Sequence, residues 1–315
     1  MRRPATPEAG RPPSRGSALI LALLVIATLS GLAVAFADAS RTEASLAGFY
    51  RDGFRAKALA QAGHEAALWA LFADEDLDVD GPGEAWSDFD GTDVPVFLDD
   101  GASMSGRIED ESGKLNVNML FSDEGEIDEA RAEQVRRLLE ILGLERSSCE
   151  ALLDWLDPDD IKRMDGAESY HYQALETPYP CANGPLLSPG QTRLVRGLEE
   201  GGLLPFITVY TDGKINVNTA PAEVLQSLDE GLDPTVAEGL ISRRTDLPFA
   251  SVEEVGEVAG MDPELFGRIR GFLTVKSSTF TVTLDARWGD TTAHLRSVVA
   301  RDEEKGPLLL YWKVV

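Results

Sequence analysis

Carboxylate side chains are concentrated between residues 157 and 168. Asp157 and Glu168 occupy positions 1 and 12 of this segment, the spacing of the first and last ligands in a calcium-binding loop. Ile161 and Lys162 stand where an EF-hand loop has a further oxygen ligand and its turn glycine, so the segment is not an EF-hand. Several hard oxygen ligands can still converge on one ion. We therefore expect a calcium site, and its candidate ligands are Asp157, Asp159, Asp160, Asp165 and Glu168.

A solvated loop is the alternative interpretation of these residues, with Asp157-Pro158 only ending a helix. A second acidic stretch, Asp76-Leu-Asp78-Val-Asp80, matches the opening of an EF-hand loop more closely. Its twelfth position is Ser87, which cannot serve as the bidentate carboxylate ligand. We interpret the second stretch as a flexible polar linker that binds no metal.

The two cysteines, Cys149 and Cys181, lie 32 residues apart and lack the C-x-x-C spacing of a zinc or redox site. In an oxidising compartment they could close one disulfide around the acidic segment. The sequence leaves this open, because it does not fix the separation of the two side chains.

The sequence shows no catalytic motif. The three histidines, His64, His171 and His294, stand far apart, and no G-x-S-x-G, H-E-x-x-H or P-loop pattern is present. Since nothing nominates a nucleophile, we expect a protein without enzymatic activity and without a small-molecule substrate.

The net charge excludes one large class of partners. Aspartate and glutamate outnumber lysine and arginine by 54 to 29, which gives a formal charge of -25. Such a surface repels the phosphate backbone of nucleic acids, whereas it attracts divalent cations and basic proteins. Nucleic acid is therefore an unexpected partner.

The N-terminal region predicts a membrane anchor. Residues 1–16 contain four arginines and one glutamate, and residues 17–37 form an uncharged run of 21 residues. A helix of this length just crosses a hydrocarbon core of about 30 Å, and the arginines place its start in the cytoplasm. A cleaved signal peptide would have a shorter apolar core. Here the run continues into helix-compatible sequence as far as Phe72, so we expect a single-pass inner-membrane protein with a periplasmic soluble part.

The junction Arg15-Gly16-Ser17 resembles the processing site of type IV prepilins. This resemblance implies that a prepilin peptidase cleaves between Gly16 and Ser17 and that the new amine of Ser17 is methylated. Pilins that build a shaft generally carry glutamate at the fifth mature position, where it neutralises the terminal amine of a neighbouring subunit. Here that position is Leu21. An unpaired amine in an apolar bundle is costly, so the chain suits the tip, where no subunit lies above it.

The remaining sequence predicts a sheet interrupted by helices. Residues 74–94 read as a loop, and strand patterns occupy residues 94–98 and 103–110 and then three segments near the C-terminus. In Phe280–Ala286 apolar and polar residues alternate, as one buried face requires. We expect a leader (1–16), an assembly helix (17–73), the first part of a sheet (74–118), an inserted α-helical domain (119–271) and C-terminal strands (272–315).

The insert contains an internal repeat. Gly113-Lys-Leu-Asn-Val-Asn118 recurs as Gly213-Lys-Ile-Asn-Val-Asn218, which predicts two related units at about 113–200 and 213–271. The second unit resembles helix-hairpin-helix modules of DNA-uptake receptors, so a pilin-like DNA receptor is the alternative function. Its turn, residues 228–235, carries three carboxylates where phosphate binding needs positive potential.

With these features together, the chain resembles the protein K family of the general secretion pathway, the large minor pseudopilins of type II secretion systems. The motifs that carry the resemblance are Asp110–Asn118, Leu152–Asp157 with Gly166-Ala-Glu168, Pro178-Tyr179 through Pro185-Leu186, and Ile215–Pro221. The resemblance implies an α/β (α+β) pseudopilin fold with an α-helical insert, bound calcium, and assembly with the minor pseudopilins I and J and then the rest of the pseudopilus.

Overall fold

The computed structural model describes residues 15–72, 77–89, 93–94, 101–122, 124–302 and 306–315. The leader expected at residues 1–16 lies almost wholly outside these ranges, as does most of the strand expected at 94–98. The chain divides into two compact units, Met1–Arg55 and Ala56–Val315.

The first unit consists of the N-terminal part of α1 (Arg15–Phe72). No proline interrupts this helix, so every turn can keep its backbone hydrogen bonds. Residues 17–46 are exposed along their whole length. By length and composition α1 is the one described helix that could cross a membrane, which agrees with the predicted anchor.

The second unit contains the C-terminal part of α1 and a five-stranded antiparallel sheet of order β1-β2-β7-β8-β9. Its strands are β1 (Asp93–Val94), β2 (Ala102–Asp110), β7 (Thr279–Trp288), β8 (Thr291–Asp302) and β9 (Gly306–Val314). The C-terminal part of α1 packs on one face through Ala56, Ala60 and Leu71, which share a core with Phe280 and Leu284 of β7. Gly63 allows this close approach, because a Cβ there would lie 2.2 Å from the Met104 sulfur.

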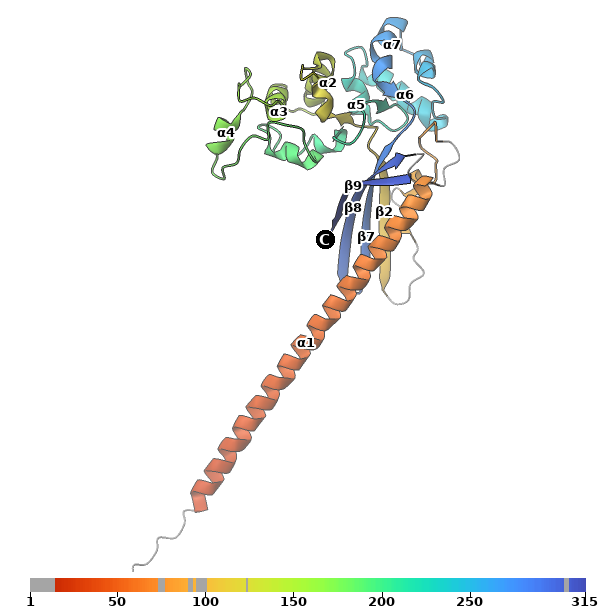
Figure 1. Ribbon diagram of the computed structural model, residues 1–315. Coiled ribbons are helices and arrows are strands. Elements are labelled where there is room, and N and C mark those ends of the chain that lie inside the picture. The colour runs from red at the N-terminus through yellow and green to blue at the C-terminus, as the bar shows by residue number, and fades with distance from the viewer. Residues whose placement is uncertain (1–14, 73–76, 90–92, 95–100, 123, 303–305) are drawn as a thin grey trace, which may run out of the picture. The chain divides into compact units, whose positions relative to one another are not determined.

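The insert lies at one end of the sheet (Figure 1). Its helices are α2 (Glu129–Ile141), α3 (Ser148–Leu156), α4 (Ser169–Gln173), α5 (Ala222–Ser227), α6 (Pro234–Asp246) and α7 (Pro263–Ile269). Two short parallel pairs join β3 (Leu115–Asn116) to β4 (Ile207–Thr208) and β5 (Ile215–Asn216) to β6 (Leu273–Thr274). The 3-10 turns are η1 (Ser87–Phe89), η2 (Val117–Leu120), η3 (Pro189–Leu194), η4 (Leu204–Phe206), η5 (Val252–Glu257) and η6 (Arg270–Phe272).

The predicted internal repeat is present as a repeated set of hydrogen bonds. Asn118 exchanges two bonds with the backbone of Leu186, from Nδ2 to the carbonyl oxygen and from the amide to Oδ1, both 2.9 Å. Asn218 makes the same exchange with Phe249, at 3.0 and 2.8 Å. Each asparagine thus fixes a distant loop within its own copy of the repeat.

The boundaries of the insert differ from those expected. The five-stranded sheet ends at Asp110 and resumes at Thr279, whereas 118 and 272 were expected. Residues 115–116 and 273–274 pair within the insert and not with the sheet. Short β-compatible runs do not by themselves tell which sheet they join.

A buried polar junction connects the sheet to the insert. Arg301 of β8 forms an ion pair with Asp80, and both side chains are almost wholly buried. The Asp80 carboxylate also accepts a 2.7 Å bond from the Ser277 amide. The Ser277 hydroxyl donates to Asp110 of β2 at 2.5 Å, and Asn216 of β5 donates to Ser277 at 2.7 Å. Burial raises the pKa of Asp80 to about 6 and also raises that of Asp110.

This junction corrects the interpretation of residues 76–80 as a flexible linker. Asp76 lies outside the described residues, and Asp78 is an exposed partner of Lys276 at 3.3 Å. Asp80, however, is fully buried. Its partner Arg301 is 221 residues away in the sequence, so no local pattern could reveal the contact.

We expect Arg301→Met to lower the free energy of unfolding by about 3 kcal/mol, because it leaves the Asp80 carboxylate buried without its cation. The measurement is urea unfolding of the full-length chain in detergent, followed by circular dichroism. Arg287→Met is the matched control, since Arg287 lies on the neighbouring strand β7 with an exposed side chain, and it should change stability by less than about 0.5 kcal/mol. Equal effects of the two substitutions would contradict the role of the junction.

Candidate metal centre

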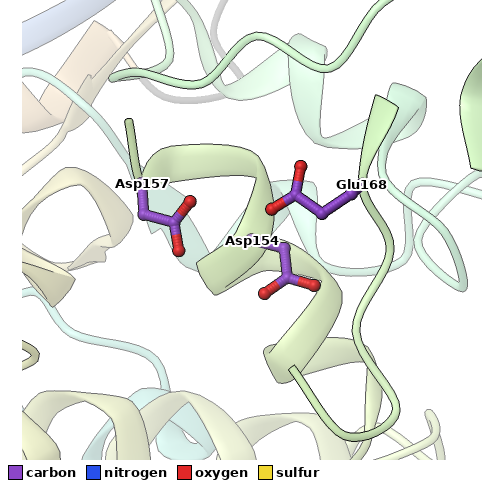
Figure 2. Close-up of side chains that lie close together, drawn as sticks. All are labelled: Asp154, Asp157 and Glu168. Carbon is purple, nitrogen blue, oxygen red and sulfur yellow. The ribbon is translucent and has the colours of Figure 1, made fainter. Parts of the chain in front are cut away.

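Three carboxylates meet where α3 ends and α4 begins. Asp154 lies in the last turns of α3, Asp157 is the residue that ends this helix, and Glu168 directly precedes α4. Asp154 and Asp157 are three residues apart, a spacing that places both side chains on one side of the helix end. The chain then returns through residues 158–167 and brings Glu168 opposite them (Figure 2).

The three side chains form a compact, buried group. One carboxylate oxygen from each lies within 4.8 Å of those from the other two. The residues are 0%, 3% and 4% exposed, in the order Asp154, Asp157 and Glu168. Buried carboxylates at this separation repel one another strongly unless a proton or a cation neutralises them.

Several oxygens of this group have no partner. Both oxygens of Glu168 and Oδ1 of Asp157 are buried and accept no hydrogen bond within the described part of the chain. Oδ1 of Asn183 is in the same condition. Unpaired buried acceptors are costly, and in a native protein they call for an ion or water. An all-oxygen donor set suits a hard divalent cation.

Arg163 supplies the positive charge that the group does have. Its Nη1 donates to Asp154 Oδ1 at 2.8 Å and to Asp157 Oδ2. The Arg163 amide also lies 3.2 Å from each oxygen of Asp154. Asp154 is therefore satisfied from within the protein, whereas Glu168 is not.

The pKa values reflect this difference. Burial, together with the nearby charges of Asp154, Asp157 and Asp160, raises the pKa of Glu168 to about 7. Burial also raises the pKa of Asp157, although the hydrogen bond from Arg163 opposes the shift. Without a cation, a proton therefore resides on Glu168 at slightly acidic pH, and a metal ion would have to displace it.

Gly166 allows the loop to close over the carboxylates. A Cβ at this position would lie 1.9 Å from Oδ2 of Asp154, so no other residue fits without displacing that carboxylate. The preceding Asp165 has a positive φ of 63°, a conformation that Asp tolerates better than most residues. These two positions explain the local path of the loop.

The structure brings together only part of the predicted ligand set. Asp157 and Glu168 belong to the group, and Asp154, which the sequence analysis missed, completes it. Asp159, Asp160 and Asp165 are exposed and lie outside it. Their oxygens serve the loop, since Asp159 accepts from the Ile161 amide, Asp160 from Asn183, and the Asp165 carbonyl from Arg196. The missed signal was the spacing of Asp154 and Asp157 at the helix end.

The possible disulfide is not formed. Cys149 and Cys181 are both buried free thiols. Their sulfurs lie near different backbone carbonyls, those of Ala132 and Asp154, each at 3.7 Å. Burial raises the pKa of Cys149 to about 12 and that of Cys181 to about 11, so both thiols are poor nucleophiles.

Comparison with known proteins identifies relatives of this chain. Two family models described as type II secretion system (T2SS), protein K match residues 113–212 and 215–276, and together they span just over half of the chain. Type II secretion system protein K of Pectobacterium carotovorum subsp. carotovorum is 29% identical over 92% of this chain and 94% of its own. Its counterpart in Pseudomonas aeruginosa is 36% identical over 56% of this chain and 54% of its own.

A solved structure shares the fold. It is a chain from the crystal structure of the GspK-GspI-GspJ complex of the enterotoxigenic Escherichia coli type 2 secretion system. The match has a TM-score of 0.71 at 19% identity and covers 84% of this chain and 98% of the other. The matched part of this chain therefore has a fold that is already known from a solved structure.

We expect Arg163→Gln to destabilise the chain by about 2 kcal/mol in chelator, because Asp154 and Asp157 lose their charged donor. Thermal unfolding of the full-length chain in detergent with EGTA measures the effect. Lys162→Gln removes the same charge from the neighbouring exposed side chain and should leave the midpoint within about 1 °C. An unchanged midpoint for Arg163→Gln would show that Arg163 does not neutralise the group.

Proposed function

Since this chain belongs to the type II secretion system protein K family and is a minor pseudopilin, we propose that it caps the tip of the pseudopilus and supports protein export across the outer membrane. The observation that carries the proposal is the two-unit insert. Both units are matched by models of this family, and they lie at one end of a sheet packed on α1. Leu21 at the fifth mature position suits a subunit with none above it.

The membrane topology belongs to the same proposal. The apolar part of α1 anchors the chain in the inner membrane by a single pass, with the arginine-rich start in the cytoplasm and the sheet and insert in the periplasm. A prepilin peptidase would cleave between Gly16 and Ser17, and the Ser17 amine would be methylated. The uncharged run from Ser17 to Ala37 supports this arrangement.

The partners of the chain would be the minor pseudopilins I and J. The solved neighbour, a complex of GspK, GspI and GspJ, supports this assignment. We propose that the corresponding siblings assemble with this chain before the rest of the pseudopilus. The role is structural, so no catalytic step is assigned to any residue.

The hairpin between α5 and α6 does not support the alternative function as a DNA receptor. Asp229 in this turn is ion-paired with Arg268 at 2.8 Å, and Asp233 caps α6 through the amides of Thr235 and Val236. The turn therefore presents carboxylates where a phosphate would have to approach. Repulsion from a chain of charge -25 acts in the same direction.

Calcium at the carboxylate group completes the proposal. Asp154, Asp157 and Glu168 would hold the ion, and the unpaired oxygens of Glu168 and Asp157 support this role. The ion would neutralise the repulsion among the buried carboxylates and fix the loop from Asp157 to Glu168. The soluble part would then keep a defined tip surface in the periplasm.

Calcium at one hundred times its Kd should stabilise the full-length chain by about 2.7 kcal/mol, which corresponds to a rise in Tm of roughly 5 °C or more. Glu168→Gln should abolish this rise. At pH 8, above the Glu168 pKa of about 7, it should also increase Tm in EGTA, because it removes one of three repelling carboxylates. Glu176→Gln, an exposed carboxylate outside the group, is the matched control and should respond to calcium like the parent. Identical melting curves of the parent with calcium and with EGTA would exclude the proposed site.

Copurification tests the function itself. The tagged full-length chain is coexpressed with minor pseudopilins I and J and purified from detergent-solubilised membranes. We expect it to retain both siblings. A duplex DNA probe at low ionic strength should not bind. Recovery of the chain alone would contradict the assignment of these partners, and DNA binding that weakens with salt would support the alternative function.

A further inference from the structure

A cleft of about 470 Å³ lies between the sheet and the insert, and none of the three carboxylates of the candidate metal centre lines it. Its floor is formed by Arg107, Thr283 and Arg296 of the sheet. The insert contributes residues in and beside η3 and η4, together with Tyr210, and β9 contributes Tyr311. These lining residues are Ser188, Pro189, Gly190, Leu204, Pro205, Tyr210 and Tyr311.

The floor of the cleft continues a row of positive charge across the sheet. Arg107 of β2 lies opposite Thr283 of β7, which lies opposite Arg296 of β8, which in turn lies opposite Lys313 of β9. Directly opposed side chains in an antiparallel sheet are about 5 Å apart, and like charges in such a pair repel. Arg296 and Lys313 are such a pair. This arrangement costs stability unless an anion lies between them.

The cations of the cleft are only partly neutralised. Arg107 pairs with Glu109 at 2.9 Å, and Lys114 pairs with Glu111 at 2.7 Å and with Glu109 at 3.7 Å. Across the described ranges, no hydrogen bond or ion pair engages the guanidinium of Arg296 or the amine of Lys313. Glu109 is the one carboxylate in the lining, against three cations. In a chain of net charge -25, this local excess of positive charge stands out.

We propose that this cleft binds a carboxylate-bearing segment of another protein, with Arg296 as the principal contact and Arg107 and Lys114 beside it. A guanidinium binds a carboxylate through two parallel hydrogen bonds. The volume falls in the range of roughly 300–1,000 Å³ found for clefts that enclose whole ligands, which is more than a lone small anion needs. Tyr210, Tyr311, Pro189 and Leu204 offer apolar contact to the flanking residues of such a segment.

A protein segment fits the charge of the chain better than a long polyanion. Nucleic acid would bring many phosphates against the acidic remainder of the surface, whereas a short acidic stretch places its charge only on the cleft. This inference goes beyond the proposed function and is tested separately from it. Binding of an acidic peptide to the cleft can be measured without the minor pseudopilins I and J. Failure of copurification would leave it intact.

The test uses the full-length chain in neutral detergent and a fluorescein-labelled hexaglutamate peptide, with binding followed by anisotropy at low ionic strength. Arg296→Gln should weaken binding by about tenfold, since one charge-assisted contact is lost. Arg270→Gln is the matched control, because it removes the same charge from an exposed side chain outside the cleft, and its affinity should equal that of the parent.

Three outcomes would overturn the proposal. They are absence of peptide binding to the parent, equal affinity of the two variants, and displacement of the peptide by inorganic phosphate at an equal concentration. The last result would assign the cleft to a small free anion. A tenfold difference between the variants, with phosphate unable to compete at that concentration, would support it.

Discussion

The buried ion pair between Asp80 and Arg301 is the contact on which the second unit depends. It joins the segment that follows α1 to the penultimate strand of the sheet, and Ser277 and Asn216 extend it to the insert. Removing either partner of a buried ion pair is strongly destabilising, because the other charge is left buried without compensation. The pair therefore holds the segment after α1 against β8, a strand that follows the insert in the chain.

Much of the fold could be predicted because its signals are local. The uncharged run from Ser17 and the alternation in Phe280–Ala286 follow from spacing within a few residues. The Asn-Val-Asn segment is recognised because the same short motif recurs one hundred residues later. The asparagines gave the most specific signal. Asn118 and Asn218 exchange hydrogen bonds with Leu186 and Phe249 in the same way, so a repeat in sequence became a repeat in structure.

The rest depends on contacts between residues far apart in the sequence. Asp80 resembles a linker residue until Arg301 is seen beside it. In the candidate metal centre, a loop template selected Asp159, Asp160 and Asp165, but those side chains remain exposed. The template assumed that one continuous segment supplies all ligands, whereas the turn at the end of α3 supplies Asp154 from outside that segment. The observed boundaries of the insert differ from the predicted ones for the same reason. Which sheet a short strand joins depends on partners that are far away in the sequence.

The two buried acidic sites show two ways in which an acidic chain can neutralise a buried carboxylate. At the junction Arg301 belongs to the fold, so the charge balance is complete when the chain folds. At the end of α3, Arg163 reaches Asp154 and Asp157 but leaves both oxygens of Glu168 unpaired. At the junction the neutralising cation is part of the chain, whereas the calcium ion proposed for the second site would have to come from the surroundings. This second site lies within the first repeat of the insert and draws none of its three carboxylates from the sheet or from α1.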